Sequence, residues 1–226
     1  MKAPLSIIAI LLINSYQAYC QNYPLLYEND FDKASTMLDF EFTDPSVWRL
    51  SDTLNNRSLE LFAQSDYESR VRSPFNIALV KSVRVGNFVL EADLKQTGRE
   101  YGHRDMCVFF GFVNATNFYY IHIASSTDQY AHNIFIVNDE PRTAISEKTT
   151  EGINWGDGWN KIRLERNMEQ GTIKLFFNDM SQPIMQATDT HFIDGYVGFG
   201  SFDDTGMIDN IKLWGELSEE KKGLFR

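Results

Sequence analysis

The chain has 226 residues, of which 43% are hydrophobic and 23% are charged, values typical of a globular protein that can bury a full core. Its formal net charge is −10, and no basic stripe is present that could neutralise phosphates, which excludes a nucleic-acid partner. Aromatic residues make up 14% of the chain, and this favours β-sheets, because aromatic side chains pack well on a pleated surface.

The first 20 residues have the pattern of a signal peptide. Lys2 supplies positive charge, residues 5–13 form an apolar run too short to span a bilayer, and small residues precede Cys20. We expect cleavage after Cys20 and a secreted protein, periplasmic or extracellular, with one domain over residues 21–226 and no membrane span. A lipoprotein anchored through Cys20 is the alternative. The oligomeric state stays open.

Cleavage at that position would leave Cys107 as the single cysteine. No intramolecular disulfide could then form, which favours a bacterial source over an animal one. Because Cys107 lies in an apolar run, we interpret it as a small buried residue.

Beyond the leader, short apolar or alternating runs follow one another between turn-rich segments. Gly171 lies in a hairpin-type connection, and a short helix is expected only in the tail, over residues 218–224. This spacing, with no long segment of helical period, predicts an all-β fold: a two-sheet antiparallel jelly-roll sandwich. The expected strands are residues 88–94, 106–113, 118–124, 132–137, 161–165, 173–178, 196–202 and 207–214.

Alternation within two of these strands separates an apolar face from a polar one. Tyr120 and His122 share one face of residues 118–124, while Glu91 and Asp93 share the polar face of residues 88–94. If both strands belong to a concave sheet, the four side chains line one groove, in which a glycan could lie.

The C-terminal half carries a family resemblance. Its residues 159–164, 174–179, 195–202 and 208–214 (WNKIRL, KLFFND, GYVGFGSF and IDNIKLW) resemble the end of concanavalin A-like jelly rolls. This broad group contains laminin-G-like domains, 3-keto-disaccharide hydrolase-like domains, glycoside hydrolases and polysaccharide lyases. The similarity extends from about Asp30 onward and implies the fold more specifically than any activity.

The sequence departs from two family patterns, and these departures argue against a retaining endoglucanase and against an animal laminin-G domain. Retaining endoglucanases of this group carry Glu-x-Asp-x-x-Glu on one strand, but here Glu91-Ala92-Asp93 lacks the second glutamate, and two-carboxylate hydrolysis needs both acids. The C-terminal disulfides usual in animal laminin-G domains are also missing from this sequence.

Residue types used by jelly-roll polysaccharide lyases gather in the middle of the chain. The resemblance implies that Arg104 neutralises a uronate carboxylate, while His103, Tyr120 and His122 share the transfer of a proton from the neighbouring carbon to the leaving oxygen. A glycosidic leaving oxygen makes the enzyme a lyase, and a free hydroxyl makes it a dehydratase. The expected substrate-binding residues are Arg72, Glu91, Asp93, His132 and Trp155, with Trp155 as a sugar-stacking platform.

The resemblance also implies a structural Ca²⁺ between the first and last strands. Asp30 and Asp209 match the places of its ligands, since Ca²⁺ takes carboxylate and carbonyl oxygens. The chain has no Cys/His spacing typical of zinc, and no motif suggests an organic cofactor.

Three functions therefore remain open. The preferred hypothesis is a secreted enzyme that acts by β-elimination, as a lyase or dehydratase, on uronate-containing oligosaccharides or polysaccharides. The alternatives are a carbohydrate-binding module without catalysis, and a hydrolase of the 3-keto-disaccharide type.

Overall fold

The computed structural model describes residues 23–53, 56–218 and 225. The expected signal peptide lies outside these residues, as does almost all of the expected helix over residues 218–224. In the described part of the chain, we find no helix with the length and apolar character that crossing a membrane would require.

Strands dominate the described residues, and the only helical elements among them are two short 3₁₀ turns, η1 (Ala34–Asp39) and η2 (Pro45–Val47). Each of the eight expected strands is present, although β5 begins twelve residues before the expected residue 88 and β15 ends three residues beyond the expected residue 214. The strands are β1 (Leu25–Asn29), β2 (Phe40–Phe42), β3 (Trp48–Thr53), β4 (Asn56–Leu61), β5 (Asn76–Gln96), β6 (Asp105–Asn114), β7 (Asn117–Ala124), β8 (Asn133–Asn138), β9 (Thr143–Ala144), β10 (Lys148–Thr149), β11 (Asn160–Asn167), β12 (Thr172–Phe177), β13 (Met185–Thr188), β14 (Gly195–Ser201) and β15 (Gly206–Leu217).

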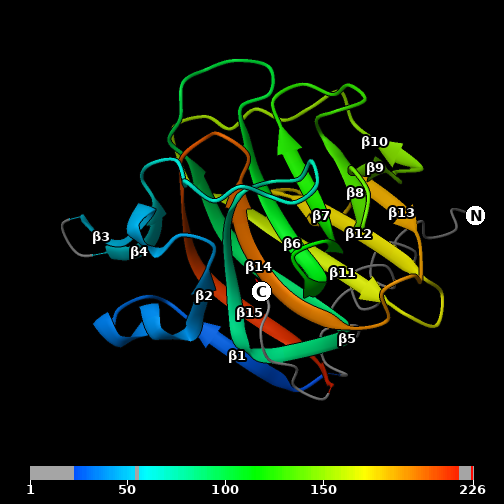
Figure 1. Cartoon of the computed structure of the whole chain (residues 1–226), viewed down its shortest axis with the longest axis horizontal. Coiled ribbons are helices and arrows are strands. Elements are labelled where there is room, and N and C mark those ends of the chain that lie inside the picture. Colours follow the sequence, from blue (N-terminus) through cyan, green and yellow to red (C-terminus); the bar gives the residue numbers. More distant parts are fainter. Residues whose placement is uncertain (1–22, 54–55, 219–224, 226) are drawn as a thin grey trace, which may run out of the picture.

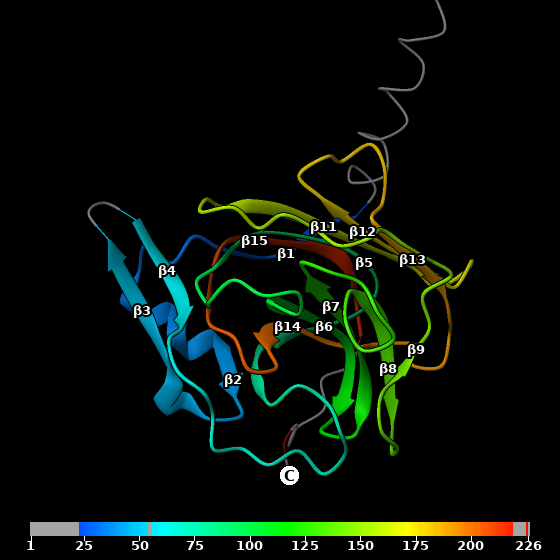
Figure 2. The same cartoon turned by 90° about the horizontal axis from the view of Figure 1, so that it is seen from above.

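The strands form two stacked layers, joined by the long strand β5 (Figures 1 and 2). Sheet I has the order β10-β13-β12-β11-β5-β15-β1, and sheet II has the order β5-β14-β6-β7-β8-β9. The second half of β5 pairs with β11 and β15, and its first half pairs with β14. All of these pairings are antiparallel, and the predicted two-sheet sandwich is confirmed.

The main core lies between the two sheets. On β7, Tyr119, Ile121 and Ile123 face inward, and on β5 the inward residues include Leu90 and Leu94, as the alternation predicted. Each of these five side chains is fully buried. Removal of this apolar surface from water is the main force that holds the layers together.

The outer face of sheet II carries a second apolar cluster. The loop from β4 to β5, residues 62–75, runs beneath this face in Figure 2, and Val71 and Phe225 pack against the cluster. Sheet II is therefore covered on both sides. The cluster consists of Ile77, Leu79, Cys107, Phe109, Phe112, Phe118, Tyr120, Phe135, Val137 and Tyr196.

A bulge at Gly111 shapes this outer face. Gly111 has φ of 54°, a backbone conformation that glycine adopts without strain, and the β6–β7 register shifts beyond Phe110. The extra residue changes the alternation. Phe109 and Phe112 consequently lie on the same side of the sheet, where Phe112 stacks on Phe118 and Phe109 contacts Phe118 at a tilted angle.

The predicted common groove for four polar residues is wrong. Glu91 and Asp93 lie on the half of β5 that pairs with β11 in sheet I, whereas Tyr120 and His122 lie on β7 in sheet II. Each pair points away from the core, so the two pairs lie on opposite faces of the sandwich. Alternation shows which residues share a face, but it cannot assign a strand to a layer.

Candidate functional site

The outer face of sheet II ends in a buried polar cluster, here called the acid cluster: Asp105, Cys107, His122 and Asp204. Cys107 and His122 lie directly opposite each other on β6 and β7. Asp105 precedes Cys107 by two residues, so it lies on the same face. Its Oδ2 lies 3.1 Å from Cys107 Sγ and 3.4 Å from His122 Nε2.

Burial dominates the electrostatics of the acid cluster. It raises the pKa of Asp105 to about 8, although hydrogen bonds from Ser201 and Cys107 oppose this shift. It also lowers the pKa of His122 to about 3, and the positive charge of Arg142 acts in the same direction. At pH 7 His122 is therefore neutral, and Asp105 is mostly protonated.

Tyr120 lies two residues before His122 and is in contact with Arg142. An N–H of Arg142 donates to the Tyr120 hydroxyl at 2.9 Å. Burial raises the pKa of Tyr120 well above its usual value, and the Arg142 guanidinium offsets only part of that rise. The guanidinium lies 4.3 Å from the ring centre of Phe202 and 4.9 Å from that of Phe135, so its position is set by two rings.

Arg142 and Arg72 form the arginine pair at the rim of this face. The backbone N–H of Arg142 donates to the carbonyl of Arg72 at 3.2 Å. Arg72 lies 5.9 Å from the ring centre of Tyr130, whose side chain is 50% exposed. Among the residues that the structure describes, neither arginine is ion-paired with a carboxylate. The chain has a net charge of −10, yet these two arginines have no carboxylate partner among the described residues. They are therefore suited to bind an anionic ligand.

Two of the expected histidines lie on either side of residues 128–130 in the chain's contacts: His103 bonds to Asp128, and His132 follows Tyr130 by two residues. His103 is exposed and its Nε2 lies 2.7 Å from Asp128 Oδ2, while the other oxygen of Asp128 accepts the N–H of Tyr130 at 2.7 Å. His132 is fully buried, and its Nε2 lies 2.9 Å from Thr150 Oγ1. The structure thus links His103 to Tyr130 through Asp128 and brings the backbone N–H of His132 to Nδ1 of His122.

Arg104 and Trp155 lie together at one end of the sandwich, where both line a small pocket of about 290 Å³. The Arg104 guanidinium is bonded to the side chain and carbonyl of Gln96. The indole N–H of Trp155 donates to the Arg104 carbonyl at 3.0 Å, and its side chain is 2% exposed. The ring therefore has no free face for a sugar in this structure.

The remaining expected residues lie apart from this region, on or beside sheet I. Glu91 is bonded to Arg163 at 2.7 Å and to Lys161 at 2.9 Å, and Asp93 accepts a bond from Asn210 at 2.8 Å. Asp30 accepts the N–H of Asp32, and Asp209 accepts the N–H of Asn210. In the described part of the chain, Asp30 and Asp209 belong to no group of three clustered His, Cys, Asp or Glu ligands, and the calcium site stays a prediction.

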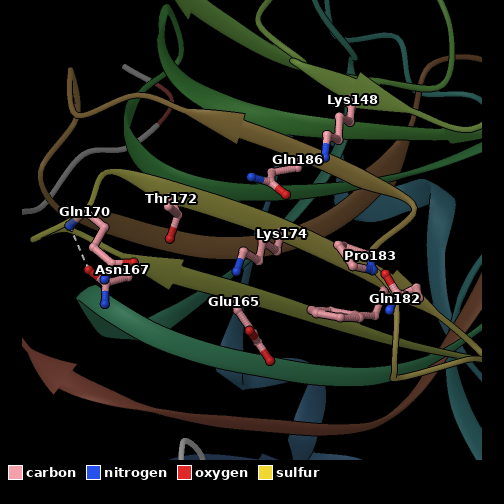
Figure 3. Close-up of a pocket in the computed structure, with 10 residues that line it drawn as sticks. Lys148, Glu165, Asn167, Gln170, Thr172, Lys174, Gln182, Pro183 and Gln186 are labelled. Carbon is pink, nitrogen blue, oxygen red and sulfur yellow. Dashed lines mark hydrogen bonds between the residues drawn. The ribbon is translucent and has the colours of Figure 1, made fainter. Parts of the chain in front are cut away.

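The outer face of sheet I carries an open groove of about 460 Å³, here called the outer groove (Figure 3). Lys148, Gln186, Lys174 and Glu165 form a row across β10, β13, β12 and β11, because each lies opposite the next in register. Asn167, Gln170 and Thr172 lie at the opposite end of the groove from Gln182 and Pro183 (Figure 3). The sequence did not indicate this groove.

Comparisons with known proteins define the fold. No protein-family model matches the chain, and no curated protein matches its sequence. Similar solved structures include the carbohydrate-binding module CBM66 from Bacillus subtilis, with 17% identity, TM-score 0.55, and 78% of this chain and 96% of that one covered. Domain 4 of AbnA, a GH43 extracellular arabinanase from Geobacillus stearothermophilus in complex with arabinotriose, has 11% identity, TM-score 0.52 and coverage of 87% and 95%.

The lectin UEA-II complexed with galactose is also similar, with 11% identity, TM-score 0.54, and 83% of this chain and 97% of that one covered. At these identities the likeness establishes a shared β-sandwich fold, and the site has to be argued from the residues of this chain.

Two residues of the region, Tyr130 and Asp105, were not identified as site residues from the sequence. Tyr130 lies in a loop, and Asp105 directly follows Arg104 at the start of an apolar run. Alternation could have placed Asp105, Cys107 and His122 on outward faces of neighbouring strands. The proximity of Arg142 to Tyr120, however, depends on how the loop before β9 folds back over β7 and β8.

Proposed function

We propose that this protein is a carbohydrate-binding module that takes acidic glycans, with the sugar carboxylate held by Arg142 and Arg72 and a sugar ring stacked on Tyr130. The observation that carries the proposal is the arginine pair, two adjacent arginines without a carboxylate partner among the described residues, beside an exposed aromatic ring.

The chemistry of the pair suits a uronate. A guanidinium binds a carboxylate through two parallel hydrogen bonds, and Arg142 needs little reordering to do so because Phe202 and Phe135 hold it in place. An exposed phenol ring supplies an apolar face for the C–H groups of a sugar and a hydroxyl for its polar edge. The sandwich fold supports this proposal, since similar structures carry names that describe sugar binding.

Affinity measurements with acidic and neutral polysaccharides test the proposal. The purified protein is titrated calorimetrically with a polyuronate and with a neutral glucan, and we expect saturable binding of the polyuronate alone. Arg142→Gln should weaken this binding by about ten- to a hundredfold, the loss expected for charge-assisted hydrogen bonds.

Lys174→Gln is the matched control, because it removes one positive charge from the outer groove on the other face. Unchanged binding by this variant, with loss in Arg142→Gln, supports the arginine pair. Loss only in Lys174→Gln would place the ligand in the outer groove. Failure of the native protein to bind any polyuronate would overturn the proposal.

A second candidate is β-elimination on the same acidic glycan, with Arg142 neutralising the carboxylate and Tyr120 and His122 transferring the proton. The contact between Arg142 and Tyr120 favours it, because the carboxylate-binding group and a proton-transfer group then lie side by side. Both Tyr120 and His122 are buried and the ring of Phe202 packs against both, so a substrate could reach them only if this cover moved.

Ultraviolet absorbance during incubation with uronate oligosaccharides separates the two candidates. A new conjugated double bond would show elimination, and mass spectrometry would distinguish a lyase, which shortens the chain, from a dehydratase, which removes water. A new reducing sugar without that chromophore would instead indicate the hydrolase. Binding without any new product would leave the module as the function.

A further inference from the structure

Two carboxylates of the acid cluster are buried without a compensating positive charge. Asp105 is 0% exposed and Asp204 is 4% exposed, and the Oδ2 of Asp204 accepts the backbone N–H of Asp105 at 2.9 Å. In the described part of the chain, neither carboxylate is ion-paired with a lysine or arginine. Buried charges in proteins are normally paired or bound to a metal, so this region calls for a cation or a proton.

The three ligand-type atoms around Asp105 converge. Carboxylate oxygen, Cys107 Sγ and His122 Nε2 all lie within 4.8 Å of one another, and all three residues are buried. Asp105 Oδ2 lies 3.1 Å from Cys107 Sγ and 3.4 Å from His122 Nε2. A tetrahedral zinc ion with bonds of 2.0–2.3 Å has ligand atoms about 3.3–3.8 Å apart, so small side-chain rotations would produce that geometry.

We propose that Asp105, Cys107 and His122 form a divalent transition-metal site, with Zn²⁺ as the metal that their chemistry fits best. The donors are one thiolate, one imidazole and one carboxylate, a set that selects zinc over the hard cations Ca²⁺ and Mg²⁺. Binding would release the Cys107 thiol proton, together with the proton that Asp105 carries in the metal-free protein, and would place two positive charges beside Asp105 and Asp204. The proposal goes beyond glycan binding and does not depend on it.

Neighbouring groups would serve as an outer layer of support. Ser201 Oγ donates to the other oxygen of Asp105 at 2.8 Å, which orients that carboxylate, as hydrogen bonds to metal ligands commonly do. Asp204 accepts from the Tyr101 hydroxyl at 2.7 Å and from the Asp105 backbone N–H at 2.9 Å, and a water could take the fourth position. A metal on His122 Nε2 requires the ring proton to lie on Nδ1. Nδ1 could then no longer accept the backbone N–H of His132, so this long contact of 3.3 Å would have to break.

Metal titration tests the site directly. The protein, in a Cys20→Ser background that leaves Cys107 as its only thiol, is stripped with a chelator and titrated with Zn²⁺ and with Co²⁺. We expect one equivalent to bind, with a rise in melting temperature. The Co²⁺ form should show an absorption band from thiolate-to-metal charge transfer. Cys107→Ser should remove that band, and His122→Asn should weaken Zn²⁺ binding at least tenfold.

His103→Asn is the control, since it removes an exposed histidine that lies outside the cluster, and it should leave Zn²⁺ affinity unchanged. The charge-transfer band of the parent protein shows whether Cys107 binds the metal, even if a variant of the cluster fails to fold. Absence of any stoichiometric binding would overturn the proposal, as would Co²⁺ binding without the thiolate band. A metal on His122 would also remove that side chain from proton transfer, whereas glycan binding at the arginine pair would remain.

Discussion

The guanidinium of Arg142 donates a hydrogen bond to the hydroxyl of Tyr120 across 2.9 Å, and this contact joins the exposed rim of sheet II to its buried face. Tyr120 stands on β7, in the middle of the sheet, whereas Arg142 belongs to the loop before β9. A rigid strand thus orients the group proposed to meet the ligand, an arrangement that lowers the entropy lost on binding.

Removal of that hydroxyl should affect both stability and binding. We expect Tyr120→Phe to lower the free energy of unfolding by about 1 kcal/mol, the usual contribution of one hydrogen bond, and to weaken polyuronate binding severalfold because Arg142 becomes less well ordered. Urea unfolding and calorimetry measure the two effects. The matched control is Tyr119→Phe, whose hydroxyl bonds to Asp189 on the core side. It should change stability alone, and equal loss of binding in both variants would contradict the role of Arg142.

The two aromatic candidates for sugar stacking should behave in opposite ways. Tyr130 is half exposed, so Tyr130→Ala should reduce polyuronate affinity and leave the melting temperature nearly unchanged. Trp155 is buried against Phe177 and bonded to Arg104, so Trp155→Phe should destabilise the fold by about 1–3 kcal/mol and leave affinity unchanged. Thermal unfolding and titration of both variants provide the comparison. Reduced affinity only in the Trp155 variant would restore that residue as the platform.

The ion pairs of Glu91 predict a dependence of stability on pH. Burial raises the pKa of Glu91, but hydrogen bonds and charges from Lys161 and Arg163 outweigh it, and the net pKa is lowered. A carboxyl whose folded-state pKa is lowered stabilises the protein above its unfolded pKa, and that contribution disappears as the pH falls through the folded value.

Comparison with Glu91→Gln isolates this contribution. At pH 7 the free energy of unfolding of the native chain should be about 1 kcal/mol larger than that of the variant, a value that already allows for solvent screening. This difference should vanish as the pH falls below about 4. Urea unfolding between pH 7 and pH 3 measures it. A difference that stays constant over this range would show that the ion pairs contribute little.

Close backbone contact at Gly200 predicts a position that tolerates no side chain. A Cβ there would lie 1.8 Å from the Asn76 carbonyl oxygen on the paired strand β5. Because the contact is with backbone, Gly200→Ala should force β14 and β5 apart and lower the free energy of unfolding by more than about 2 kcal/mol. The yield of soluble protein and the melting temperature report this loss. Gly158, where a Cβ would have no neighbour within 4 Å, provides the control substitution to alanine.

Local patterns in the sequence predicted eight of the strands of this protein, and alternation predicted the two faces of residues 88–94 and 118–124. Tyr119, Ile121 and Ile123 face the core, and Tyr120 and His122 face away from it, because neighbouring side chains along a strand must point to opposite sides. The antiparallel sandwich followed from the spacing of such strands and turns. These properties depend on residues close together in the chain, so a sequence carries them directly.

Only the tertiary structure decided which of these strand faces lie on the same side of the sandwich and which residues come into contact. Glu91 and Tyr120 lie on opposite sides of the sandwich, because β5 passes from one sheet to the other and the pairing of its two halves depends on distant strands. The same holds for Arg142 against Tyr120 and for Asp105 beside Asp204, which are 99 residues apart. Long-range pairing and loop packing bring these groups together, and local alternation contains no information about either.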